Sequence, residues 1–313
     1  MTNLSLNRQG SLQRKLYKIF RYKWQLLLMI LLPLAWYIIF CYTPMYGVQI
    51  AFRDYSARKG YLGSPFVGLK HFQRFFSSYY CGDVIWNTLS ISLFSLAVGF
   101  PAPILLAIII NELPGRVMKK ALQNLTYIPH FLSTVVLCSM LYLFLSREYG
   151  VVNKLIEAFG GEPTAFLEND KYFRTVYVLS GVWQESGWSS IIYIAALAGI
   201  DPALHEAATI DGASRLQRVR HISLPGIVPT IVVLLVLRMG NLMSVGFEKA
   251  LILQNDLNLG ASEIISTLVY KRGILKAELS FSTAVGLMNS VINLLLIVGA
   301  NMFCNHFFEE SLW

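Results

Sequence analysis

Six long apolar stretches constrain this chain more than any other feature of its sequence. A helix needs about 20 residues to cross the roughly 30 Å hydrocarbon core of a bilayer. The six stretches are residues 24–42, 85–110, 121–145, 175–200, 226–247 and 282–303. Charged residues make up 14% of the chain, against about 25% in soluble domains. A soluble surface of this size needs more charge, so we predict an all-α integral membrane protein with about six transmembrane helices.

Several of these stretches contain proline. Pro33 lies in the first, Pro101 and Pro103 in the second, and Pro129 near the start of the third. Transmembrane helices tolerate proline because neighbouring helices and hydroxyl side chains satisfy the freed backbone groups. The prolines therefore predict bent helices rather than fewer spans.

Basic residues beside the apolar stretches predict the orientation. Five lie directly before the first stretch: Arg14, Lys15, Lys18, Arg21 and Lys23. Three more, Arg116, Lys119 and Lys120, lie in the short loop 111–120. Because lysine and arginine in short loops favour the cytoplasm, we expect both termini and the loop 201–225 on that side. This placement fits anionic lipid headgroups, and the spread of charge over loops argues against a nucleic-acid partner despite a net charge of +8.

The same pattern gives the expected organisation of the chain. We expect a basic cytoplasmic segment 1–23, a first transmembrane helix with an extracellular loop over 24–84, a transmembrane core over 85–306, and a short tail 307–313. The first apolar stretch lacks a small-residue cleavage pattern, so we expect it to be retained as a helix.

The four cysteines, Cys41, Cys81, Cys138 and Cys304, are far apart in the sequence. None forms a Cys-x-x-Cys pair, so neither a zinc site nor a redox dithiol is indicated. The chain also lacks the Gly-x-x-x-x-Gly-Lys-Ser/Thr phosphate loop, so it has no ATP site of that kind.

The loop between the fourth and fifth stretches carries the most informative motif. Asp201 is a helix N-cap, and Pro202 suits the first helical position. Alanines favour a short helix, which Gly212 ends. A second short helix should run to Ile222 and end before Pro225, because proline disfavours helix at the preceding residue. We expect a helix–turn–helix elbow on the cytoplasmic face.

This loop resembles the EAA motif of type I ABC importer permeases. The matching residues are Glu206, Ala207, Ala208, Gly212, Ile222, Leu224 and Pro225, and Asp211-Gly212-Ala213 extends the match toward maltose-permease-like sugar importers. Val219 stands where these proteins often have phenylalanine. Segments 43–52, 67–72, 87–89, 127–133 and 311–313 are similar to the poly- and oligosaccharide importer subgroup.

The resemblance implies a function and a set of partners. A permease of this family pairs with a second permease, and two cytoplasmic ATPase subunits use ATP and magnesium, so this chain itself needs no cofactor or metal. An extracellular solute-binding lipoprotein delivers the saccharide. The elbow, residues 201–225, would dock on the ATPase, with Glu206 facing a basic residue and Gly212 permitting close approach. The expected location is the bacterial plasma membrane.

Ionisable residues within the apolar stretches suggest where a solute passes. At about 1.5 Å per residue, Glu185 and Arg238 both fall near the middle of the bilayer. They either pair with each other or with a partner permease, or line a sugar pathway. The further candidates for that pathway are Trp183, Gln184, Trp188 and Asn241. Aromatic faces, amides and charged groups suit sugar binding.

Other residues and functions remain open from sequence alone. Asn289 and Asn293 suit hydrogen bonds between helices, and His130 suits a structural role. The alternatives to a sugar permease are a type I permease for another solute, a channel or receptor, and a membrane-embedded enzyme using Glu185 and His130. The enzyme would leave the EAA-like elbow unexplained.

Overall fold

The computed structural model describes residues 23–308, apart from the side chains of residues 307 and 308, and divides the chain into two compact units, 1–68 and 69–313. The predicted basic segment before Lys23, with Arg14, Lys15, Lys18 and Arg21, and the segment 311–313 lie outside the described residues. Within the described part, helices dominate, and the one β-bridge joins Arg53 to Phe66.

The first unit consists of one long helical run and a short loop. The run comprises α2 (Trp24–Tyr37), a π-helical turn (Ile38–Tyr42), α3 (Thr43–Met45) and a 3₁₀ turn (Tyr46–Phe52), followed by α4 (Gly60–Gly63). The most apolar part of this 29-residue run buries no residue within the chain. A helix that is apolar on all sides requires a lipid or protein environment, as expected for a transmembrane helix.

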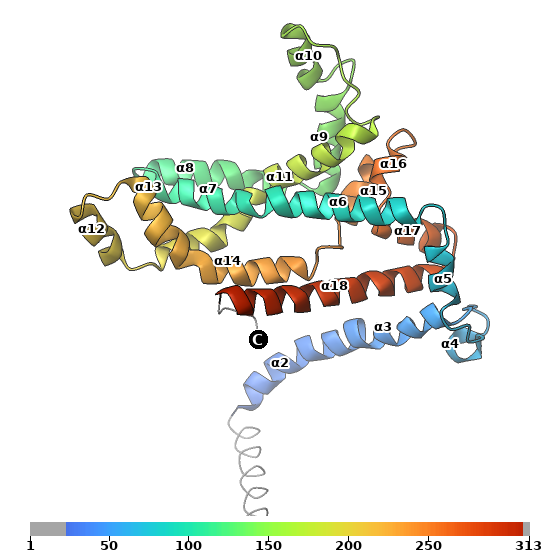
Figure 1. Cartoon of the computed structure of the whole chain (residues 1–313). Coiled ribbons are helices and arrows are strands. Elements are labelled where there is room, and N and C mark those ends of the chain that lie inside the picture. The colour runs from blue at the N-terminus through green and yellow to red at the C-terminus, as the bar shows by residue number, and fades with distance from the viewer. Residues whose placement is uncertain (1–22, 309–313) are drawn as a thin grey trace, which may run out of the picture. The chain divides into compact units, whose positions relative to one another are not determined.

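The second unit is a helical bundle (Figure 1). Its first half contains α5 (Lys70–Phe76), α6 (Cys81–Gly99), α7 (Pro101–Glu112), α8 (Arg116–Tyr127), a 3₁₀ turn (Ile128–Phe131), α9 (Thr134–Leu145) and α10 (Val151–Ala158). Its second half contains α11 (Asp170–Ala198), α12 (Pro202–Ile210), α13 (Arg215–Arg218), a π-helical turn (Val219–Ser223), α14 (Leu224–Met239), α15 (Phe247–Leu253), α16 (Leu259–Ser262), α17 (Ile265–Tyr270), a π-helical turn (Lys271–Leu275) and α18 (Leu279–Phe308).

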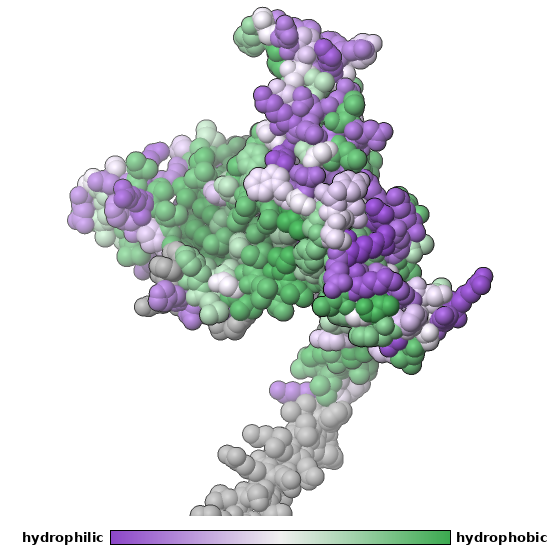
Figure 2. Space-filling model, turned by 45° about the vertical axis from the view of Figure 1, so that its right-hand side comes forward, coloured by the Kyte–Doolittle hydropathy of each residue, from purple (hydrophilic) through white to green (hydrophobic). Residues whose placement is uncertain are grey.

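Helix α11 lies at the centre of the second unit. It packs against α6, α7, α8 and α14, while α14 also packs against α18. Figure 1 places α12 and α13 at one end of the unit and α16 and α17 at the other. Figure 2 shows an apolar region between polar ends, the surface expected of a bundle that spans a membrane.

The helices confirm the predicted class of fold. Four continuous runs in the described residues are long and apolar enough to span a membrane: Trp24–Phe52, Cys81–Glu112, Arg215–Met239 and Leu279–His306. Two bent pairs bring the number to six if each counts as one span. Arg116–Phe131 meets Thr134–Leu145 at 99°, and Asp170–Ala198 meets Pro202–Ile210 at 71°. The first bend follows Pro129, in agreement with the predicted effect of proline.

The structure corrects two predicted helix ends. Helix α14 ends at Met239 rather than at residue 247, and residues 240–246 are not a continuous helix. The second helix of the elbow does not end before Pro225, because one helical run continues from Arg215 to Met239. A π-helical turn over Val219–Ser223 precedes the proline. Its wider hydrogen-bond spacing accommodates a residue that lacks an N–H group.

Candidate functional site

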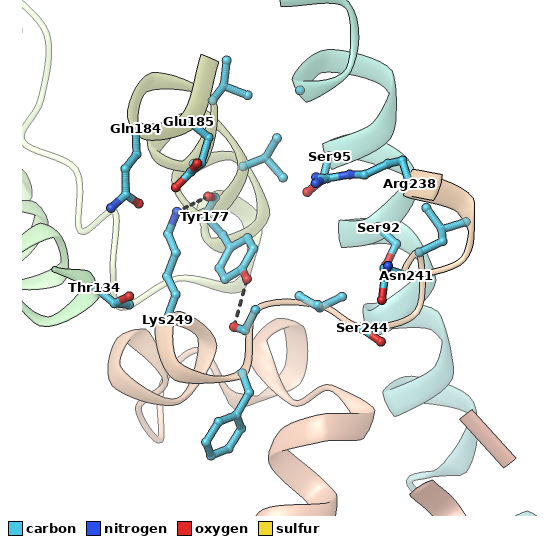
Figure 3. Close-up of a pocket in the computed structure, with 18 of the residues that line it drawn as sticks. Ser92, Ser95, Thr134, Tyr177, Gln184, Glu185, Arg238, Asn241, Ser244 and Lys249 are labelled. Carbon is cyan, nitrogen blue, oxygen red and sulfur yellow. Dashed lines mark hydrogen bonds between the residues drawn. The ribbon is translucent and has the colours of Figure 1, made fainter. Parts of the chain in front are cut away.

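A cavity of about 500 Å³ opens beside the end of α14. Its walls come from α6, α11, the segment 240–246 and α15 (Figure 3). Non-helical backbone at membrane depth is tolerated where it lines a cavity or is covered by protein. Helix α14 ends at Met239, and the unwound segment that follows it lines the cavity with polar backbone and side chains.

Arg238 and Asn241 lie on one side of this cavity. Arg238 is in the last turn of α14, where a positive charge interacts favourably with the helix dipole. Its side chain extends toward Ser95 of α6 (Figure 3). Among residues 23–308, no carboxylate lies within ion-pair distance of Arg238. Its guanidinium group is therefore available to a partner or a solute.

Glu185 lines the cavity from α11 but does not pair with Arg238. Its carboxylate lies 3.0 Å from Nδ1 of His130, in the 3₁₀ turn at the bend of the third span. The ring of His130 also stacks on Trp188, with 4.6 Å between ring centroids and an interplanar angle of 3°. Glu185 thus has His130 rather than Arg238 as its partner within the chain, and it still faces the cavity.

The remaining candidates on α11 separate by their position around the helix. Gln184 lines the cavity and donates a hydrogen bond from Nε2 to the carbonyl oxygen of Leu132, at 2.9 Å. Trp183 instead lines an apolar groove between α9 and α11. Successive residues differ by about 100° around a helix, so Trp183 and Glu185 face opposite directions. Trp188 lines a second, smaller cavity that Arg238 also borders.

Lys249 is a cavity residue that the sequence analysis missed. Its side chain is 8% exposed, and Nζ donates a hydrogen bond to the carbonyl oxygen of Tyr177, at 2.7 Å. The ammonium group also lies 4.7 Å from the centre of the Tyr177 ring. The Tyr177 hydroxyl donates in turn to the carbonyl of Gly246, at 3.0 Å. The sequence signal is a lysine in the segment Phe247–Leu253, most of which lies beyond the predicted end of the fifth stretch at residue 247.

The asparagines assigned to inter-helix contacts behave differently from each other. Oδ1 of Asn293 accepts a hydrogen bond from the backbone N–H of Met243 at 2.9 Å, which connects α18 to the segment 240–246. Oδ1 of Asn289 is buried without a hydrogen-bond partner within the described residues. The cavity wall is therefore held in part by Asn293, as an inter-helix role predicts.

The elbow is built by local capping interactions. The Asp201 side chain accepts a hydrogen bond from the N–H of Ala203 at 2.9 Å, which caps α12. At the other end, Ala213 N–H donates to Ala208 and Gly212 N–H to Thr209, as in a Schellman motif. Residues Ala207 and Ala208 lie within α12, and Asp211 is its C-cap. These contacts confirm a short helix with a sharp end at Gly212.

A second set of contacts joins α12 to α13. Ser214 and Gln217 form a capping box at the start of α13. The Arg218 guanidinium donates to the Thr209 hydroxyl of α12. Ile222, Leu224 and Pro225 lie further along the helical run that begins at Arg215. The motif residues thus divide between the surface helix α12 and the start of a transmembrane helix.

The outer surface of the elbow is exposed and partly apolar. No residue of α12 is buried, and Glu206 has no ion pair within the part of the chain that the structure describes. Ile210 is 86% exposed and Leu216 is 77% exposed. The elbow thus presents an exposed carboxylate together with exposed apolar side chains.

Within the chain, Gly212 is required by its backbone conformation. Its φ is +78°, and a Cβ at this position would meet no atom within 4 Å. We expect Gly212→Ala to lower the free energy of unfolding of the elbow by about 1 kcal/mol, because an L-residue is strained in this conformation. Hydrogen exchange of the amides of α12 would measure the change. Gly212→Asn should have a smaller effect, and equal exchange in all three proteins would contradict the prediction.

The comparisons with known proteins agree with this geometry. Residues 99–304 match the model of the family described as binding-protein-dependent transport system inner membrane component. The chain belongs to this family of transport proteins. Two Bacillus subtilis relatives are the polygalacturonan/rhamnogalacturonan transport system permease protein YteP, 44% identical over 96% of this chain and 94% of its own, and LplB, 42% identical over 94% and 92%.

Solved structures extend the match to nearly the whole chain. A chain of a bacterial ABC transporter that imports the acidic polysaccharide alginate is 39% identical, with a TM-score of 0.87 over 94% of this chain and 99% of that one. A chain of the alginate transporter bound to its pentasaccharide-loaded periplasmic protein is 38% identical, with a TM-score of 0.88 over 95% and 100%. This family member is therefore a membrane-embedded transport permease and not an enzyme, as the sequence predicts.

Proposed function

We propose that this chain is a permease subunit of an ATP-driven importer that moves an oligosaccharide or polysaccharide fragment across the bacterial plasma membrane. The observation that carries the proposal is the match over nearly the whole chain to a structure of a polysaccharide importer. The cavity supports it because its lining is rich in hydroxyl, amide and charged groups. Such groups bond the hydroxyls of a sugar.

The proposed assembly has four further components. A second permease completes the pathway, two cytoplasmic ATPase subunits bind ATP and magnesium, and an extracellular binding lipoprotein delivers the saccharide. This chain holds no cofactor of its own in the proposal. Both termini and the elbow lie in the cytoplasm, which agrees with the basic residues of the short loop 111–120.

The proposed solute pathway follows the cavity. It includes Gln184, Glu185, Arg238 and Asn241, with Trp188 beside the adjoining cavity. Trp183 is left out because it faces the groove between α9 and α11. Lys249 is added because it lines the cavity from α15.

The proposed ATPase contact is the exposed face of the elbow. Glu206 supplies a free carboxylate, and Ile210 and Leu216 supply apolar area. An apolar residue at the centre of an interface often contributes about 2 kcal/mol or more to binding, which is roughly 30-fold in affinity. The carboxylate adds orientation and a charge-assisted contact.

This contact predicts the effect of two substitutions. The tagged chain is purified from its native membranes in mild detergent, and the proteins that accompany it are quantified by mass spectrometry. We expect an ATPase and a second permease with the unmodified chain. Ile210→Asp should reduce recovery of the ATPase about tenfold or more, and Glu206→Ala should reduce it less, while the second permease is retained.

The control is Phe159→Asp, which changes another highly exposed apolar residue, 89% exposed after α10 and far in sequence from the elbow. It should leave ATPase recovery unchanged. Undiminished recovery with Ile210→Asp and Glu206→Ala would exclude the elbow as the docking surface. Recovery of the unmodified chain alone would contradict the importer proposal itself.

A further inference from the structure

The four charged side chains that line the cavity differ in how they are neutralised. They are Glu185, Arg238, Glu248 and Lys249. The carboxylate of Glu185 lies 3.0 Å from Nδ1 of His130. Glu248 is exposed in the first turn of α15, at the rim. The two cations have no ion-pair partner among the described residues. Within this part of the chain, therefore, neither cation is engaged in an ion pair.

Arg238 and Lys249 present this charge in different ways. Lys249 is buried, and its ammonium group is held by the carbonyl and the ring of Tyr177, which are neutral. It contributes a positive field but has little surface for contact. Arg238 is exposed within the chain and borders both the main cavity and the adjoining one. Its guanidinium group is therefore the cation that a solute can touch.

An unpaired guanidinium at membrane depth is costly unless an anion or a polar partner accompanies it. Arginine binds a carboxylate through two parallel hydrogen bonds, which gives both strength and a fixed orientation. A neutral sugar offers only hydroxyl groups to the same donors. The charge pattern therefore fits a carboxylate better than a neutral solute.

We propose that the saccharide carried through this cavity bears carboxylate groups, and that Arg238 selects for them by direct contact, supported by the charge of Lys249. The inference rests on the proposed import function and adds the chemical class of the solute. Hydroxyl side chains along the cavity, among them Ser95, Thr134 and Ser189, serve the sugar hydroxyls in this arrangement. Two of the similar proteins are named for acidic polysaccharides, alginate and polygalacturonan, and the sugars of both carry carboxylate groups.

The test compares two probes with the same sugar backbone, pentagalacturonate and its fully methyl-esterified form, in which the carboxylate charges are removed. The assembled complex is purified without the binding protein and titrated calorimetrically with each probe. We expect the acidic probe to bind on the order of tenfold more tightly than the ester. Arg238→Gln should remove this difference, and Arg238→Lys should retain part of it, because lysine keeps the charge but loses the bidentate geometry.

A matched control is Arg147→Gln, which makes the same change in the turn that follows α9, away from the cavity lining. It should leave both affinities unchanged. Equal affinity for the two probes, or no binding of either, would overturn the inference. A uniform loss of both affinities with Arg238→Gln would also overturn it, because Arg238 would then hold the assembly together rather than select the solute.

A second measurement separates this inference from the proposed function. ATP hydrolysis by the complete transporter is stimulated with binding protein loaded with pentagalacturonate or with a neutral galactopentaose. Stimulation by the neutral saccharide alone would support import while overturning carboxylate selection. Absence of stimulation by any loaded binding protein would contradict both. Stimulation by pentagalacturonate that falls about tenfold in Arg238→Gln, but not in Arg147→Gln, is the expected result.

Discussion

Replacing Gly187 by alanine should destabilise the second unit by about 3 kcal/mol, at the upper end of the effects of overpacking. Gly187 lies on the buried face of α11, where the backbone of α8 approaches closely. A Cβ at this position would overlap the carbonyl oxygen of Thr126, and backbone cannot move aside as a flexible side chain can. The thermal unfolding midpoint of the protein in detergent, followed by tryptophan fluorescence, should fall by several degrees.

The matched control for this prediction is Gly286→Ala in α18. No atom lies within 4 Å of a Cβ built there, so alanine has room. Since alanine also favours helix over glycine, this variant should be neutral or slightly more stable. A similar midpoint for Gly187→Ala and the unmodified protein would show that α8 and α11 are further apart than described.

Replacing Asn87 by leucine should destabilise the contacts between α6, α11 and α16, with a loss of about 2 kcal/mol. The Asn87 side chain is 2% exposed and joins three elements. It donates to the carbonyls of Gly260 and Glu263, at 2.7 and 3.1 Å, and accepts from Arg174 at 2.9 Å. Leucine would remove a hydrogen-bond partner from two carbonyls and a guanidinium donor, and a polar group that stays out of water without a partner costs roughly 1–3 kcal/mol.

Hydrogen exchange would localise this loss. We expect faster exchange in α16 and α17, which the Asn87 contacts attach to α6, and little change in α12. The control is Asn124→Leu, the same substitution at an exposed position of α8. Uniform acceleration over the whole chain, or none, would contradict the role of Asn87 as a local connection.

The number of spans could be predicted from sequence because each depends on one local property. About 20 apolar residues in succession have few stable states outside a membrane. The end of the fifth span could not be predicted in the same way. Residues 240–247 remain apolar enough to continue α14, but Asn293 of α18 and Tyr177 of α11 bind the unwound backbone. These partners are distant in sequence, so no local pattern reveals them.

The elbow shows the same division between local and distant causes. Its caps at Asp201 and Gly212 were predictable because each involves residues only a few positions apart. The prediction that Pro225 ends a helix was wrong, because the helical run passes through a π-helical turn just before the proline and continues to Met239. In the cavity, the pairing of Glu185 with His130 joins residues 55 positions apart. The cost of a charge within the bilayer predicted that Glu185 faces a partner or a solute pathway, but it could not name His130.

The unbroken helix from Arg215 to Met239 has a mechanical consequence. Its 25 residues make a rod of about 37 Å that begins beside the elbow and ends at Arg238 in the cavity wall. Tilting such a rod by about 5° about one end displaces the other by about 3 Å, roughly the length of a hydrogen bond. A small tilt of this helix at the elbow is therefore enough to move Arg238 by the length of one hydrogen bond.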